Sequence, residues 1–235
     1  NYAVKKYESI FVYSDFMKDE AIKTYIKPSK LVKVPSPQYD FFNNNNKSKN
    51  NKVVLVFSGR LSKSKGIKYL IKAVYLLKNK GYSNFIVSIF GEGPDEAYLK
   101  ELSKKLGLTD IITFFGWVDR QVLVETYKKA HISVIPSTYP DNFPNTVAES
   151  MLASLAVIAF DSGGTCEWFN HMESGIKITN KTEKNLSEEI EKLLNDKDLM
   201  RKIGKNARDK ILLNHSLKRT FDVYAKHYEK VLKEG

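Results

Sequence analysis

The segment "YPDNFPNTVAESM" carries two acids, Asp141 and Glu149, eight residues apart on either side of a proline. Pro144 suits the first turn of a helix because it has no backbone N–H to satisfy. A helix that begins there leaves the amides of Asn145 and Thr146 without intrahelical partners and directed outward. Such amides can bind a phosphate, and nearby carboxylates can accept hydrogen bonds from a polyhydroxy ligand. Taken singly, Asp141 would equally fit a helix cap and Glu149 a surface position.

A second segment whose residues could bind a ligand is "SGRLSKSKG", which follows an apolar run. Gly59 permits a tight turn, Arg60 supplies a fixed cation, and Lys65 stands just before Gly66, where a helix is predicted to open. Because a helix N-terminus adds free N–H groups and a partial positive charge, this segment suits a diphosphate. It is neither a Walker A loop nor a G-x-G-x-x-G motif, so those nucleotide-binding classes lose support. The alternative is a loop with two solvated cations.

Two weaker segments, "FGEGP" and "FFGWVD", also follow apolar runs. Gly91 lies in the first, where a close turn between a strand and a helix explains the glycines equally well. Gly116 in the second would let the backbone approach a flat ring, with Trp117 or Val118 beside it; a tryptophan at the edge of the core is the commoner case. Together the four segments fit a ligand with a diphosphate, a flat base and many hydroxyls, which describes a nucleotide-sugar.

The elements that position these segments alternate regularly. Apolar strands followed by amphipathic helices indicate βα units on a parallel sheet that is covered on both faces. The sequence therefore predicts an α/β fold, a doubly wound, Rossmann-like parallel sheet with a helical C-terminus, whose ligands bind at the carboxyl ends of the strands. The predicted strands are 53–59, 85–93, 111–116, 131–137, 156–164 and 175–180. The predicted helices are 65–81, 95–107, 120–130, 145–154 and a short one near 165–169, and 182–233 is expected to be helical in three amphipathic segments, "EEIEKLLND", "DLMRKIGKNARDKILLN" and "FDVYAKHYEKVLKE".

The first forty residues read differently from the rest. A short strand at 9–14 ends at Ser14, a predicted helix cap, and is followed by a helical stripe over 15–26 and a strand-like "KLVKVPSP". The polar, low-complexity run 43–51 is the best domain boundary. The first residues show neither an initiator Met nor a signal-peptide pattern, and we expect the chain to be cut from something longer.

Composition narrows the function classes. The 235 residues carry a net charge of +11, but only 5 of the 38 basic residues are Arg, the better reader of bases and phosphates. Nucleic-acid binding therefore ranks last, and attraction to an anionic membrane surface ranks above it. The one cysteine, Cys166, fits a reducing compartment and is predicted to be inert. The four histidines are scattered without metal-ligand spacing.

In order and spacing, "SGRLSKSKG", "FGEGP", "FFGWV", "PSTYPDNFPNTVAES" and "DSGGTCEWF" resemble the donor-binding, C-terminal half of a retaining GT-B glycosyltransferase of the group 1, family 4 type. The resemblance covers about 53–180. Residues 8–37 resemble the end of an N-terminal GT-B domain, and 217–232 a helix that crosses back to it. The implied division is a remnant of the N-terminal domain at 1–40, a linker at 41–52 and a nucleotide-sugar-binding domain at 53–235.

The resemblance also implies roles for individual residues. The catalytic group comprises Asp141, which stands at the first Glu of the family's E-x7-E motif and faces the donor sugar, and Arg60 and Lys65, which stabilise the departing diphosphate. No metal and no other cofactor is implied. The donor-binding residues are Gly59, Gly91, Trp117 and Val118 (base), Asn145 and Thr146 (sugar or phosphate) and Glu149 (ribose).

The implied function is transfer of a sugar, with retention, from a nucleotide-sugar to a glycan or lipid-linked acceptor in the synthesis of cell-surface polysaccharide or lipopolysaccharide. The expected location is cytoplasmic and peripheral at the inner face of the membrane. Another GT-B enzyme, such as a nucleotide-sugar epimerase, and a non-catalytic nucleotide-sugar-binding or interaction module are the alternatives.

Three departures from the family pattern qualify that expectation. Asp141 is one methylene shorter than Glu, and Ser154 and Ala156 replace the usual Gly and Pro. The third departure is the lack of an N-terminal domain, so the chain is expected to bind a donor but to transfer sugar poorly or not at all.

Overall fold

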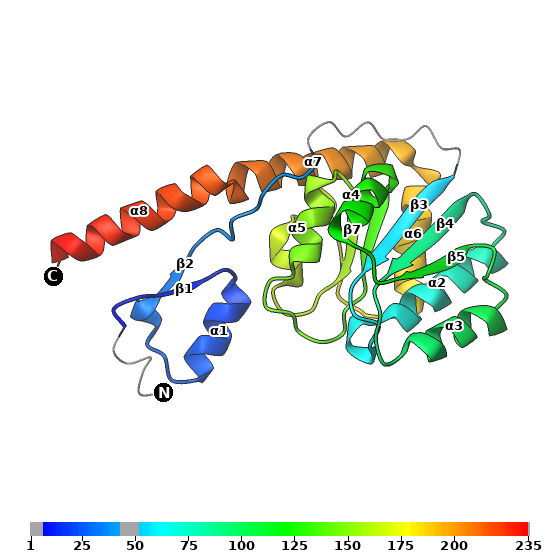
Figure 1. Cartoon of the computed structure of the whole chain (residues 1–235), viewed down its shortest axis with the longest axis horizontal. Helices are drawn as coiled ribbons and strands as arrows, with labels where there is room; N and C mark the ends of the chain where they lie inside the picture. Colours follow the sequence, from blue (N-terminus) through cyan, green and yellow to red (C-terminus); the bar gives the residue numbers. More distant parts are fainter. Residues whose placement is uncertain (1–6, 43–51, 235) are drawn as a thin grey trace.

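The computed structural model describes residues 7–42 and 52–234, and within them six parallel strands form one main sheet (Figure 1). The strands are β3 (Val53–Ser58), β4 (Phe85–Phe90), β5 (Ile112–Gly116), β6 (Ile132–Ile135), β7 (Ala156–Phe160) and β8 (Ile176–Ile178). Their order across the sheet is β5-β4-β3-β6-β7-β8, so the chain winds outward from β3 in one direction and from β6 in the other. The predicted doubly wound parallel sheet is confirmed.

Two apolar cores explain why the sheet is covered on both faces. Successive residues of β3 alternate between them, with Val53, Leu55 and Phe57 in one core and Val54 and Val56 in the other. The first core is covered by α2 (Ile67–Asn79), α3 (Glu96–Lys105) and α6 (Glu183–Asn195), the second by α4 (Arg120–Lys129) and α5 (Asn145–Leu152), and α7 (Lys197–His215) contributes to both. Because both faces of the sheet are covered, these runs are mostly apolar; the exceptions include the buried Ser88 and Ser133 and the exposed Lys177 of the edge strand β8.

Close backbone approach fixes the edge of the sheet where the strands end. The helix α2 begins beside the end of β6 because Gly66, at φ +70°, has no Cβ; a Cβ there would lie 1.8 Å from the carbonyl oxygen of Pro136. A Cβ at Gly91 would lie 2.0 Å from the carbonyl oxygen of Gly59. The winding direction reverses between β3 and β6, and a doubly wound sheet of this kind is expected to bind its ligand beside that point.

The N-terminal residues form a separate small unit. The strands β1 (Ile10–Val12) and β2 (Leu31–Lys33) pair in parallel, joined by α1 (Asp15–Lys23) and a short 3-10 helix, η2 (Pro28–Lys30). Ser14 caps α1 as predicted, since its Oγ accepts a hydrogen bond from the amide of Met17 at 3.0 Å. The helix ends before the predicted Ile26 because Tyr25 adopts φ +67°, outside the helical region.

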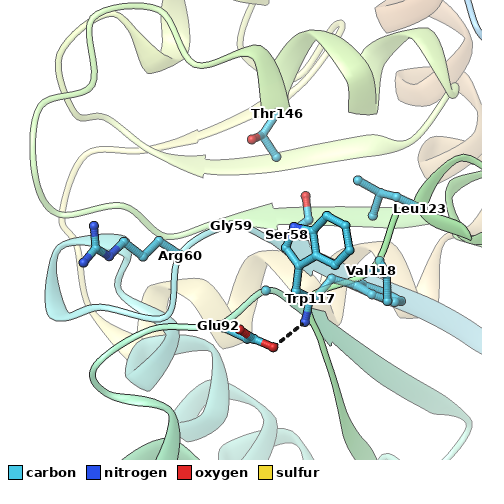
Figure 2. A pocket seen from close by; sticks show the side chains of 10 residues that line it. Ser58, Gly59, Arg60, Glu92, Trp117, Val118, Leu123 and Thr146 are labelled. Atoms are coloured by element: carbon cyan, nitrogen blue, oxygen red, sulfur yellow. Dashed lines mark hydrogen bonds between the residues drawn. The ribbon is translucent and has the colours of Figure 1, made fainter. Parts of the chain in front are cut away.

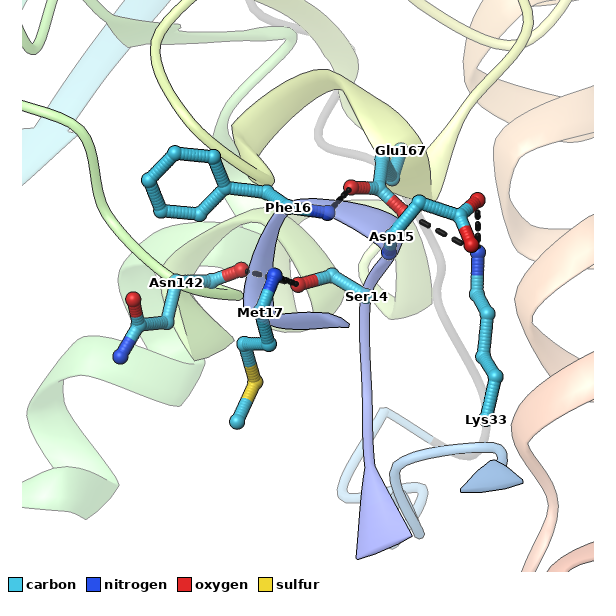
Figure 3. A network of polar contacts seen from close by, with 7 residues as sticks. All are labelled: Ser14, Asp15, Phe16, Met17, Lys33, Asn142 and Glu167. Carbon is cyan, nitrogen blue, oxygen red and sulfur yellow. Dashed lines mark hydrogen bonds and ion pairs between the residues drawn. The ribbon is translucent and has the colours of Figure 1, made fainter. Parts of the chain in front are cut away.

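Polar contacts attach α1 to the main unit, as Figure 3 shows. The Glu167 carboxylate, in the 3-10 helix η4 (Thr165–Trp168), accepts hydrogen bonds from the amides of Asp15 at 2.7 Å and Phe16 at 2.8 Å. Lys33 pairs with the same carboxylate at 3.0 Å. Ser14 Oγ donates to the carbonyl of Asn142 at 2.8 Å. Glu167 therefore satisfies first-turn amides of a helix that would otherwise need water.

The C-terminal helix α8 (Leu217–Glu234) continues α7 after Ser216 and runs back to the N-terminal unit (Figure 1). Phe11 of β1 packs edge-on against Tyr224, with ring centroids 4.8 Å apart. No helix within the described ranges is both long and apolar enough to cross a membrane. The predicted helical C-terminus is confirmed, with its three segments present as α6, α7 and α8.

The predicted linker lies mostly in 43–51, outside the described residues, and the division into domains stays a prediction. Just before that gap, residues 36–42, named the strap from here on, run from β2 along the main unit. Gln38 donates its amide to the carbonyl of His215 at 2.8 Å. Phe42, at the start of the predicted linker, is buried against Tyr127.

Ser154 ends α5 in the left-handed conformation, at φ +56°. The amide of Leu155 donates to the carbonyl of Ser150 at 3.0 Å, as in a Schellman-type helix end. A left-handed residue at this position is the conformation that the family's usual glycine adopts without strain. Ala156, where the family pattern has Pro, donates its amide to the carbonyl of His131 at 2.9 Å, a bond that proline cannot make.

Replacing Ser154 by glycine is expected to raise the free energy of unfolding by about 1 kcal/mol, because the Cβ of any other residue strains a left-handed backbone. Urea unfolding of both proteins measures the difference. Ser154→Ala keeps the Cβ and serves as the matched control, with no gain in stability. Equal stabilities for the glycine and alanine variants would contradict the strain argument.

Replacing Glu167 by alanine is expected to loosen α1, at a cost of about 1 kcal/mol, because two first-turn amides lose a charged acceptor. Hydrogen exchange of the α1 amides measures the loss locally. Glu167→Gln, which keeps an acceptor without the charge, should fall between wild type and alanine. Glu20→Ala removes only an exposed pair with Lys23 and is the control; equal effects from both alanine variants would refute the attachment.

Candidate functional site

A pocket of about 440 Å³ opens where the ends of β3, β4 and β5 face the start of α5 (Figure 2). It lies outside the carboxyl ends of the strands, where the doubly wound topology predicts a ligand. The residues that line it are Ser58, Gly59, Arg60, Phe90, Gly91, Glu92, Trp117, Val118, Leu123 and Thr146.

Backbone hydrogen bonds between neighbouring strand ends hold the floor of this pocket. The amide of Gly59 donates to the carbonyl of Phe90 at 3.1 Å, and the amide of Gly91 donates to the carbonyl of Gly116 at 2.7 Å. Each loop therefore rests on the next, and the side chains that follow are placed by backbone rather than by side-chain contacts.

The pocket has two chemically different ends. Trp117, Val118 and Leu123 lie together at one end, and Arg60 extends from the other (Figure 2). The Trp117 side chain is 71% exposed, so its indole ring is accessible. The Arg60 guanidinium has no ion pair among the described residues, and its charge is uncompensated. An apolar, aromatic end and a cationic end match a base and a phosphate group, respectively.

Glu92 is a lining residue that the sequence reasoning missed. Its carboxylate accepts a hydrogen bond from the amide of Trp117 at 3.3 Å (Figure 2). The amide that was expected to meet a base thus already has a partner in the ligand-free protein. The available signal is the acid that stands between the two glycines of "FGEGP", directly after an apolar run.

A buried tyrosine lies behind the pocket wall. Tyr127 of α4 is 1% exposed, and its hydroxyl is 2.7 Å from Ser58 Oγ at the end of β3. Burial raises the pKa of Tyr127 to about 12, so the hydroxyl keeps its proton and can donate to Ser58. Sequence spacing gave no sign of this contact, because the partners are 69 residues apart.

Lys65 and Asp141 form an ion pair and do not line the pocket in Figure 2. Lys65 Nζ lies 2.9 Å from Asp141 Oδ1 and 2.8 Å from Oδ2. The Asp141 backbone is held by the amide of Gly164, which donates to its carbonyl at 2.8 Å. Two of the predicted catalytic residues are thus brought together, each as the partner of the other.

Glu149 and Asn145 line a neighbouring cavity of about 520 Å³, which the strap borders. Glu149 Oε1 lies 3.3 Å from Arg120 Nη2. Burial raises the pKa of Glu149, and the nearby Arg120 charge opposes that rise. Arg120 is a second residue that sequence reasoning missed, since it stands 29 positions from its partner on a different helix.

The helix α5 begins at Asn145, as predicted, and Pro144 precedes it. The amides of Asn145 and Thr146 have no hydrogen-bond acceptor among the described residues, and Thr146 faces the pocket (Figure 2). Of the ten predicted site residues, six line this pocket: Gly59, Arg60, Gly91, Trp117, Val118 and Thr146. The other four are Lys65, Asp141, Asn145 and Glu149, and the proposed role of every one remains a prediction.

Cysteine and histidine chemistry contributes little here. Burial raises the pKa of Cys166 to about 12, so its thiol stays protonated, as expected of an inert cysteine. Among the described residues, no group of three or more His, Cys, Asp or Glu side chains is placed to hold a metal ion. The expectation of a reaction without metal stays a prediction.

Comparison with known proteins identifies a protein family that this sequence matches. Residues 38–210 match the family described as "Glycosyl transferases group 1". An uncharacterized glycosyltransferase of Methanocaldococcus jannaschii is 30% identical over 175 residues, which are 73% of this chain and 44% of that protein. The chain thus spans less than half the length of this relative.

Solved structures agree in fold. A glycosyltransferase from Rickettsia africae ESF-5 superimposes with a TM-score of 0.85 at 23% identity, covering 97% of this chain and 64% of that one. The Anabaena protein HepE, solved in complex with UDP, superimposes with a TM-score of 0.83 at 19% identity, covering 97% and 65%. At these identities the likeness shows the GT-B type of Rossmann-like fold alone.

The family match begins in the strap and runs through every strand-end loop of the pocket into α7. It covers well over half of the 235 residues, and the chain therefore belongs to the group 1 glycosyltransferases.

Proposed function

We propose that the pocket in Figure 2 binds a nucleotide-sugar and that the chain is the donor-binding, C-terminal half of a retaining, family 4 type glycosyltransferase. The observation that carries the proposal is the division of the pocket into an apolar, aromatic end at Trp117 and an uncompensated cation at Arg60. A base and a diphosphate on one molecule satisfy both ends at once.

The start of α5 supports the same ligand. The unpaired amides of Asn145 and Thr146 present donors to a phosphate or a sugar hydroxyl, and the helix dipole favours negative charge there. The carboxylate of Glu149, one turn further on, is an acceptor for ribose hydroxyls.

The mechanism proposed for these residues is electrostatic. Negative charge develops on the diphosphate oxygen as the bond to the sugar breaks, and cations and amides already in place stabilise that charge without reorganising. Arg60 is ready for this role in the ligand-free protein. Lys65 must first leave Asp141, whose carboxylate would then be free to face the donor sugar. In this scheme protein cations and amides perform the stabilisation, and we propose that no metal is required.

The identity of the substrates is a further part of the proposal. HepE is solved with UDP, which makes UDP the first nucleotide to test. We propose a glycan or lipid-linked acceptor, in cell-surface polysaccharide or lipopolysaccharide synthesis, and a cytoplasmic protein at the inner face of the membrane. The net charge of +11 supports contact with anionic lipid.

One observation favours a second candidate, a non-catalytic nucleotide-sugar-binding module. The ion pair of Lys65 with Asp141 neutralises two predicted catalytic groups, and Asp141 is a methylene shorter than the family's Glu. A turnover assay separates the two candidates. If the complete protein releases UDP from a UDP-sugar when a sugar acceptor is added, it is an enzyme; if it binds the UDP-sugar without releasing UDP, it is a binding module.

Replacing Arg60 by alanine is expected to weaken UDP binding by about tenfold or more, because a charge-assisted contact to the diphosphate is lost. Calorimetric titration of the chain with UDP, GDP and ADP gives the dissociation constants and identifies the base. Arg201→Ala is the control, since Arg201 pairs only with its helix neighbour Asp198 on the surface. Equal affinities for the two alanine variants would contradict the role of Arg60.

Replacing Asp141 by asparagine is expected to tighten UDP binding on the order of threefold, because Lys65 no longer has to break an ion pair to reach the diphosphate. The same titration measures the effect. In a Lys65→Gln background the Asp141 substitution should then change nothing. Weaker binding by the Asp141→Asn variant would show instead that Asp141 orients Lys65 for the ligand.

A further inference from the structure

Arg120, the first residue of α4, stands between an aromatic ring and a carboxylate. Its guanidinium lies 4.0 Å from the centroid of the Phe41 ring and, through Nη2, 3.3 Å from Glu149 Oε1. A planar guanidinium can stack on a ring face and still direct its N–H groups sideways to a carboxylate. The arrangement uses both capabilities of the side chain.

The strap fixes the ring on which Arg120 stacks. On one side of Phe41, the amide of Gln38 is bonded to the carbonyl of His215 at 2.8 Å. On the other side, Phe42 is buried, and its amide donates to Asp40 Oδ1 at 2.9 Å. The Asp40 carboxylate is paired in turn with Arg208 of α7, 2.5 Å from Nη2. Phe41 is thus anchored on both sides by the backbone and by ion pairs.

The carboxylate of Glu149 depends on Arg120 because it has few other polar partners. Among the described residues, the Arg120 guanidinium is the one group that donates a hydrogen bond to its carboxylate. Among the described residues, the charged group near this carboxylate is Arg120, and the titratable group near it is the protonated hydroxyl of Tyr127, on the same helix as Arg120. A half-buried carboxylate without a cation would either take up a proton or turn toward solvent.

We propose that Arg120 is a positioning residue that keeps Glu149 ionised and oriented to accept hydrogen bonds from the ribose hydroxyls of the donor. Arg120 occupies one oxygen of the carboxylate, which leaves Oε2 and the remaining lone pair of Oε1 for a vicinal diol. The strap supplies the stack and so takes part in donor recognition from outside the pocket. This inference rests on the proposed function, since it assigns a ribose to the ligand.

The first test compares UDP with 2′-deoxy-UDP in calorimetric titrations of wild type, Arg120→Gln, Arg120→Lys and Glu149→Gln. Arg120→Gln should raise the dissociation constant for UDP roughly two- to fivefold and that for 2′-deoxy-UDP less, so the preference for ribose shrinks. Arg120→Lys should restore part of the preference for UDP over 2′-deoxy-UDP, because lysine keeps the positive charge but cannot stack as a planar group. In a Glu149→Gln background, Arg120→Gln should have no further effect. Arg201→Gln is the matched control.

The second test needs no nucleotide. A carbon-13 NMR titration of glutamate carboxyls, assigned with Glu149→Gln, follows the pKa of Glu149 in the ligand-free chain. Burial already raises this pKa, and the loss of the Arg120 charge should raise it further, so that protonation on acidification begins at a higher pH. Phe41→Leu should shift it in the same direction by less.

The outcomes separate the two ideas. Equal weakening of UDP and 2′-deoxy-UDP by Arg120→Gln, or a Glu149 pKa that does not move, overturns the positioning role. A wild-type chain that binds no nucleotide overturns the proposed function and the ribose assignment with it, while the titration still decides whether Arg120 controls the ionisation of Glu149.

Discussion

The close approach of neighbouring strand ends is the constraint on which the site depends. The loops after β3, β4 and β5 lie against one another through main-chain hydrogen bonds, and the approach between Gly59 and Gly91 leaves no room for a Cβ at Gly91. Because the floor is made of backbone, the side chains above it vary without disturbing the sheet. The same loops can then carry an arginine at one end and an indole at the other, at no cost to the core.

The charges around the site are balanced in the ligand-free protein. Lys65 lies on Asp141, and Arg120 lies on Glu149, so each carboxylate already has a cation. Partly buried charges are costly when unpaired, which is a reason for such pairs to form before a ligand arrives. Arg60 differs because it is exposed and has no ion pair among the described residues. An incoming diphosphate therefore meets one ready cation and one that has to exchange partners.

Much of the fold could be predicted from the sequence, and less of the site. Most positions of the central strands are apolar because both faces are covered, so runs such as 53–57 indicate a parallel sheet without knowledge of any contact. The left-handed end of α5 at Ser154 is consistent with the glycine that the family usually has at that position. The pairing of Arg120 with Glu149 and of Tyr127 with Ser58 was not, because each joins distant elements whose relative placement depends on helix packing. The residue types indicated which side chains could bind a ligand or take part in a reaction. Only the three-dimensional arrangement indicated which of these side chains already pair with another residue of the protein.

The strap leads from the N-terminal unit to the main unit, and α8 leads from the main unit back to the N-terminal unit. The strap contacts the junction of α7 and α8, where Gln38 lies beside His215 and Ser216. A single tether would let the small unit turn freely about its own axis. Two adjoining tethers resist twisting and sliding and permit chiefly a bend about the line that joins them. Any such bend of β1, α1 and β2 relative to the main unit would break or restore the contact of α1 with Glu167. A bend there would act a few residues from Phe41, the ring on which Arg120 stacks.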